Sequence, residues 1–98
     1  MTTEIDDAIT NRVEIEFTYN GLPRVVRPGA HGIHHTTGNT FLRGYQVDGE
    51  SSSRVPPFWD MFLTEKIVDL VVTERRFSDD PPDYSRDDRH MSTIFTQL

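Results

Sequence analysis

The chain has 98 residues, a formal net charge of −6 and no cysteine. This length allows one domain with a single modest core, and the lack of cysteine excludes disulfides, zinc–thiolate sites and thiol nucleophiles. The acidic start, residues 1–7, lacks the basic and apolar pattern of a signal peptide, and no apolar run reaches the roughly 20 residues of a membrane span. We therefore expect a cytoplasmic protein without a membrane partner.

The first part of the chain predicts a helix followed by a β-hairpin. Residues 3–12 carry the apolar stripe of a short helix, with a threonine cap and acidic residues in the first turn. From Val13 to Tyr19, apolar residues alternate with polar ones, as in a strand that is buried on one face. Asn20-Gly21 then predicts a tight turn, because both residues tolerate positive φ, and residues 24–27 form the returning strand.

The middle of the chain predicts a strand with an arginine at its centre. It follows a short strand at residues 30–33 and covers residues 40–47, "TFLRGYQV". Because side chains alternate along a strand, Phe41, Arg43 and Tyr45 share one face and the residues between them share the other. We expect the Phe/Arg/Tyr face to lie outward or in a cleft of the folded protein.

The last part of the chain predicts two strands, a linker and a helix. Residues 58–63 and 67–73 have the alternation and the β-branched residues of strands. Residues 78–85, "SDDPPDYS", predict an extended linker that Tyr84 attaches to the domain. Residues 86–97 follow a helical period, and their apolar stripe consists of Met91, Ile94, Phe95 and Leu98.

These elements predict a mainly β protein with flanking helices and a single domain. Residues 1–12 are an N-terminal helix packed on a barrel, residues 13–77 are the barrel, and residues 78–98 are the extended linker and a C-terminal helix. About five short strands with tight connections favour a small, strongly bent barrel, since closure removes the sheet edges. An open meander with helices on one face is the alternative.

Several segments in register resemble the WYL domain family. Ala8-Ile9 and the strand Ile15–Tyr19 fit the family's lead-in, and Arg24 lies four residues before Pro28. Thr40-Phe41-Leu42 occupies the tripeptide that names the family, residues 62–67, "FLTEKI", occupy its last motif, and Phe77 closes the pattern. Together these matches span about residues 5–77.

The resemblance implies a WYL-like barrel of the SH3 or Sm-like type with a ligand-sensing, regulatory role. Such barrels are thought to bind nucleotides or pieces of nucleic acid through a basic and aromatic surface. This chain departs from the family pattern at four positions. Thr40 replaces the tryptophan, Phe41 the tyrosine, Lys66 the terminal arginine, and Asp60 an arginine that precedes the last motif.

The predicted ligand site combines cations and rings from neighbouring strands. Its residues are Arg24, Phe41, Arg43, Tyr45 and Lys66. Arginine suits phosphate because its planar guanidinium donates two hydrogen bonds at once, and an aromatic face can stack on a base. The alternative is structural, since charged barrel surfaces usually pair their arginines with glutamates and aspartates across strands.

Metal and catalytic chemistry find less support in the sequence. His31, His34 and His35 fall in a hairpin that lacks the fixed spacing of helical metal ligands, so we predict no metal site. No serine has a neighbouring base or a Gly-x-Ser-x-Gly turn, so we predict no catalytic residues and no enzyme activity. We also expect no cofactor.

The function predicted from the sequence is a non-enzymatic domain that binds an anionic, nucleotide-like ligand or a short single strand. The alternative is a protein–protein interaction or homo-oligomerisation module, with a homodimer formed through the C-terminal helix or an exposed strand. Recognition of a specific duplex DNA sequence is not expected, because the chain offers no recognition helix and its ends are acidic.

Overall fold

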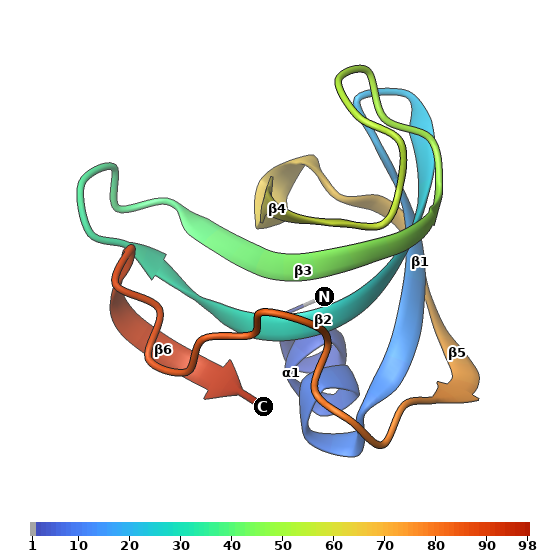
Figure 1. Ribbon diagram of the computed structural model, residues 1–98. Helices are drawn as coiled ribbons and strands as arrows, with labels where there is room; N and C mark the ends of the chain where they lie inside the picture. Colours follow the sequence, from blue (N-terminus) through green and yellow to red (C-terminus); the bar gives the residue numbers. More distant parts are fainter. Residues whose placement is uncertain (1) are drawn as a thin grey trace.

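The computed structural model describes residues 2–98, without the side chain of Thr2, and shows a mainly β protein (Figure 1). Met1, the first residue of the predicted helical region, lies outside the described residues. The elements are α1 (Thr2–Asn11), β1 (Val13–Tyr19), β2 (Leu22–His34), β3 (Thr40–Gly49), β4 (Phe58–Leu63), the 3₁₀ helix η1 (Thr64–Lys66), β5 (Val68–Arg76) and β6 (Met91–Gln97).

The six strands form one antiparallel sheet around the long strand β2. The strand order is β4-β3-β2-β1-β5, and β6 pairs with β2 as well. The first half of β2 pairs with β1, for example Val26 with Ile15, and its second half pairs with β6, for example His31 with Thr96. Strand β2 can serve two partners on one edge because its 13 residues are long enough to hold them one after the other.

The predicted closed barrel is not confirmed. In the part of the chain that the structure describes, β4 and β5 end the sheet and make no backbone pairing with each other, so the sheet is open. A side chain bridges part of this opening, since the hydroxyl of Tyr19 at the end of β1 accepts a hydrogen bond of 3.0 Å from the backbone N–H of Leu63. The mainly β class is confirmed, and the alternative of an open sheet agrees with the observed pairing.

The main core lies on one face of the sheet, which we call the inner face, and α1 covers it. Ile5, Ala8 and Ile9 of α1 are buried against the sheet, as their helical spacing predicts. From the strands the same core receives Val13, Ile15, Phe17, Val26, Leu42 and Phe62, and Ile67 joins it from between η1 and β5. The rings of Phe17, Tyr19 and Phe62 meet edge to face, with centroids 5.0 to 6.4 Å apart.

The predicted C-terminal helix is wrong, because residues 91–97 form strand β6. The apolar positions of this segment fit a helical stripe, yet Thr93-Ile94-Phe95-Thr96 is also a run of strand formers. Pairing with the second half of β2 satisfies the backbone of both strands. As a result Met91 is buried, whereas Phe95, expected in the helix stripe, is 44% exposed. Tertiary pairing thus decides between two patterns that the local sequence supports.

The segment between β5 and β6 is irregular, as predicted for residues 78–85 but not for residues 86–90, where the sequence predicts the start of the C-terminal helix, and it is attached to the sheet at several points. It runs from the end of β5 to the start of β6 and passes in front of β2 in Figure 1, where it is orange. The indole Nε1–H of Trp59 donates to the carbonyl oxygen of Pro82 over 2.6 Å. The hydroxyl of Tyr84 donates to the carbonyl oxygen of Leu98 over 3.2 Å. The predicted attachment through Tyr84 is therefore confirmed.

Candidate ligand site

Strand β3 presents two faces with different surroundings, in the alternation that the sequence predicts. Leu42 and Gln46 point to the inner face, where both side chains are fully buried. Arg43 and Tyr45 point to the other side, which we call the outer face, where they pair with Met61 and Trp59 of β4. The predicted site is therefore divided between two sides of the sheet.

Arg24 lies on the inner face, and its side chain is part of the interior. The residue is only 4% exposed and sits opposite Phe17 in the β1–β2 pairing. Its Nη1 donates to Gln46 Oε1 over 3.2 Å, and its Nη2 donates to the carbonyl oxygen of Tyr19 over 3.1 Å. The guanidinium carbon also lies 5.6 Å from the ring centroid of Tyr19 and 5.8 Å from that of Phe62.

The buried charge of Arg24 has no carboxylate partner among the described residues, and its Nε is buried without a hydrogen-bond partner. The two aromatic faces and two neutral oxygens stabilise it instead. Gln46 extends this network, since its Nε2 donates to the carbonyl oxygens of Asp48 and Glu50. Arg24 therefore joins β1, β2 and the end of β3, which is a structural role.

Arg43 lies on the outer face in an ion pair with the segment that follows β5. Its Nε donates to Asp88 Oδ2 over 2.8 Å, and its Nη2 lies 3.2 Å from His90 Nδ1. The guanidinium carbon is 5.5 Å from the ring centroid of Phe41, which is fully buried beneath it. Phe41, Arg43 and Asp88 thus connect the outer face of the sheet to the 83–90 segment.

The carboxylate of Asp88 is held in its charged form. Burial alone would raise its pKa, but the hydrogen bond from Arg43, the backbone N–H of His90 and the attraction of the Arg43 charge together lower the pKa below its ordinary value. Asp88 and Arg43 therefore remain a charged pair at neutral pH, and their charges cancel locally.

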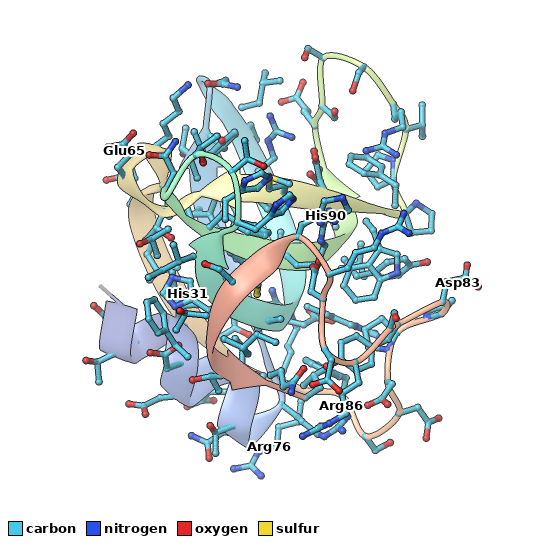
Figure 2. All side chains as sticks on the ribbon, turned by 90° about the vertical axis from the view of Figure 1, so that its left-hand side faces the viewer. His31, Glu65, Arg76, Asp83, Arg86 and His90 are labelled. Carbon is cyan, nitrogen blue, oxygen red and sulfur yellow. The ribbon has the colours of Figure 1, made fainter. Side chains whose placement is uncertain are left out.

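The remaining predicted cations do not join a common site. Lys66 is exposed in η1, and its neighbour Glu65 lies on the opposite side of the view in Figure 2 from Asp83 and Arg86. Arg27, a further cation of β2, donates from its Nε to Glu14 Oε2 over 3.1 Å. Because Arg24 is on the inner face, Arg43 on the outer face and Lys66 in η1, the expected convergence of these cations does not occur.

A cavity of about 450 Å³ lies on the outer face, between the sheet and the 83–90 segment. Arg43 and Trp59 line it from the sheet, and seven residues of the 83–90 segment line the rest. We call it the outer-face cavity. Its volume lies within the range of roughly 300 to 1,000 Å³ that is typical of small-molecule sites.

Three rings form a ladder along this cavity. The centroids of Tyr45 and Trp59 are 5.3 Å apart, and those of Trp59 and Tyr84 are 6.0 Å apart. Trp59 packs on the backbone at Gly29, where a Cβ atom would lie 2.9 Å from the indole ring, so only glycine fits there. Sequence reasoning missed Trp59, although its place in the strand 58–63 opposite Tyr45 could have pointed to it.

Three histidines gather beside the cavity, but their hydrogen bonds oppose metal binding. The ring centroid of His34 lies 4.9 Å from that of His35 and 6.3 Å from that of His90. The Nδ1 atom of His34 accepts from the backbone N–H groups of Thr36 and Thr37, which leaves the proton of the neutral ring on Nε2. No group of three potential ligands within residues 2–98 has the geometry to hold a metal ion.

A hydrogen-bonded relay of Asp6, His31 and Thr64 crosses the interior. His31 Nδ1 lies 3.0 Å from Asp6 Oδ1, and Nε2 lies 3.0 Å from Thr64 Oγ1. The order resembles that of a nucleophile, base and orienting carboxylate. His31 is fully buried, however, Thr64 is only 8% exposed, and none of the three lines the outer-face cavity. The relay connects α1, β2 and η1.

Comparison with models of protein families, with curated proteins and with solved structures finds no match to this chain. Within the described part of the chain, no helix has the length and apolar character needed to cross a membrane. The assignment of a function therefore depends on the geometry of the site.

Proposed function

We propose that the protein is a non-enzymatic domain that binds a small ligand in the outer-face cavity. The observation that carries this proposal is the fixed aromatic wall of the cavity, in which Trp59 and Tyr84 line the space and Tyr45 packs against Trp59 without lining it. Trp59 is held by Gly29 beneath it and by Pro82 at its Nε1, so the wall is ready before a ligand arrives. Such preorganisation reduces the entropic cost of binding.

The proposal retains only part of the predicted site. Arg43 and Tyr45 lie at the cavity or against its wall, and Phe41 supports Arg43 from below. Arg24 and Lys66 are not among its lining residues, so we assign them no contact with a ligand. Membership of the WYL family, an SH3-type barrel, a sensor role and a cytoplasmic location remain predictions.

A ligand screen with a blocked cavity tests the proposal. Full-length protein is mixed with a library of nucleosides, nucleotides, aromatic acids and organic cations, and thermal shifts are compared with the NMR signal of the Trp59 indole N–H. Trp59 is the only tryptophan, so this signal reports the cavity without overlap. We expect binders to move the indole signal in the wild type and not in Ser85→Phe, where a phenyl ring fills the space and Trp59 stays the only tryptophan.

Two matched variants complete the design. Ser52→Phe adds the same ring to an exposed loop outside the cavity, and Lys66→Ala removes an exposed cation of the predicted site. Both should keep every response of the wild type. A library without a single compound that moves the indole signal would contradict the proposal.

A second candidate function is self-association through β5, which one observation favours. Strand β5 is an edge strand paired only with β1, and Val68, Val71 and Val72 are between 42% and 54% exposed. An exposed apolar edge is a template for pairing with another strand. Two irregularities in its register with β1 weaken this template. Light scattering should then show a mass that rises with concentration in the wild type and not in Val71→Lys, whereas a constant monomer mass would exclude it.

A further inference from the structure

The sheet-side cation at the outer-face cavity is already neutralised. Arg43 donates to Asp88 over 2.8 Å, and its Nη2 faces His90 Nδ1, so an anion entering the cavity would have to compete with a carboxylate that is held in place. Asp88 itself is fixed by the backbone N–H of His90. A phosphate group therefore finds no uncompensated charge on the sheet side.

The rings of the cavity offer their faces and not their polar atoms. The donor of Trp59 is used by Pro82, and the hydroxyl of Tyr84 is used by the carbonyl oxygen of Leu98. Burial raises the pKa of Tyr84, so its ring stays neutral and keeps its donor on Leu98. The parts of Trp59 and Tyr84 that line the cavity therefore present aromatic surface and no free hydrogen-bond donor.

The other charges at the cavity are negative in balance. Among its lining residues, once Arg43 and Asp88 cancel, Asp83 and Asp87 are opposed by Arg89, while Arg86 lies outside the lining and donates to the carbonyl oxygen of Leu98. Asp87 accepts a hydrogen bond from the neutral amide of Gln97 over 3.0 Å, so its charge is not compensated by that contact. The chain as a whole has a net charge of −6, so its long-range field also attracts cations and not anions.

Aromatic faces combined with carboxylates are the surroundings in which proteins hold alkylated ammonium groups, because the ring quadrupole attracts a cation that hydrogen bonds cannot satisfy. We propose that the outer-face cavity takes a small organic cation with an alkylated ammonium head group, and not the nucleotide-like anion that the sequence predicts. This inference rests on the proposed ligand-binding function and narrows it to one class of ligand.

The test separates charge from shape by titrating three probes into full-length protein at constant ionic strength. The probes are choline, its neutral isostere 3,3-dimethylbutan-1-ol and adenosine monophosphate, and the readout is the NMR signal of the Trp59 indole N–H. We expect choline to shift this signal, the neutral isostere to bind at least about tenfold more weakly because it lacks the cation–π attraction, and the nucleotide to leave the signal unchanged.

Carboxylate variants test the electrostatic part. Asp83→Asn combined with Asp87→Asn should weaken choline binding by about tenfold, since partly exposed charge pairs each contribute modestly, and should leave binding of the isostere unchanged. Asp79→Asn, an exposed control outside the cavity, should bind choline like the wild type. Asparagine keeps an acceptor for Gln97, so the fold of the segment is preserved.

The outcomes distinguish this inference from the function on which it rests. If the nucleotide or another anion moves the indole signal and choline does not, the inference is overturned while the proposed function stands. Equal binding of choline and its neutral isostere also overturns it. If no probe and no library compound moves the signal, both fall together.

Discussion

Two arginines, one on each side of the sheet, show how differently this small domain treats a cation. Arg24 on the inner face is almost completely buried, has no carboxylate partner among the described residues, and is held by neutral oxygens and two ring faces. Arg43 on the outer face is partly exposed and forms an ion pair with Asp88. Both lie near aromatic rings, but only Arg43 lines a cavity.

The difference follows from what each face packs against. The inner face is closed by α1 and the core, so a cation there must be satisfied within the fold or not occur at all. The outer face is covered by an irregular segment attached at a few points, which leaves a cavity between the segment and the sheet. A site predicted from the sequence that includes both arginines therefore combines Arg24, which has a structural role, with Arg43, which lines the candidate binding cavity.

The largest expected effect is the loss of stability in Arg24→Ala. The change removes two hydrogen bonds from a charged donor, one to the carbonyl oxygen of Tyr19 and one to Gln46 Oε1, which is left buried without this partner. We expect the free energy of unfolding to fall by about 3 kcal/mol. Urea denaturation followed by circular dichroism measures it.

Arg43→Ala is the matched variant on the other face. It should reduce the free energy of unfolding by only about 1 kcal/mol, because a partly exposed ion pair contributes little. Arg24→Met keeps the apolar stem without the donors and should fall between the two. A smaller loss in Arg24→Ala than in Arg43→Ala would reverse the assignment of structural and surface roles.

The parts of the fold that the sequence predicts well are those in which the local pattern and the final environment agree. The alternation of faces in Val13–Tyr19 and in residues 40–47 is observed, except that Glu14 and Phe41, both expected on the exposed side, are buried, and the apolar stripe of Ile5, Ala8 and Ile9 faces the core. The turn at Asn20-Gly21 is also present, with both residues at positive φ.

The parts that the sequence does not predict depend on contacts between distant residues. Strand β6 forms because β2 extends far enough to offer it a free edge. The sequence of residues 91–97 fits either a helix or a strand, and it does not reveal that this edge exists. The ion pair of Arg43 spans 45 positions in the chain, so pairing with Asp88 could not be distinguished from an open binding site. The cavity likewise depends on how residues 83–90 return to the sheet, which no local pattern specifies.

A smaller effect is the pH dependence that Asp88 gives to the free energy of unfolding. It tests the comparison between Arg43, which pairs with Asp88, and Arg24 more sharply. The pKa of Asp88 in the folded protein lies below its ordinary value of 3.8, so the carboxylate favours folding above that pH, and this contribution disappears as the pH falls through 3.8 toward the folded-state pKa. Asp88→Asn should therefore lose about 1 kcal/mol of the free energy of unfolding at neutral pH. That difference from the wild type should shrink as the pH falls below 3.8, because the wild type then loses the charge as well. Urea denaturation from neutral pH into this acidic range measures the difference, and Asp79→Asn provides an exposed control for a general change of one charge.

Because Arg24 has no carboxylate partner among the described residues, Arg24→Ala should keep its full loss of unfolding free energy in acid, provided that the wild type still folds there. If the loss of unfolding free energy disappeared in acid for Arg24→Ala and persisted for Asp88→Asn, the assignment of the ion pair to Arg43 and not to Arg24 would be wrong.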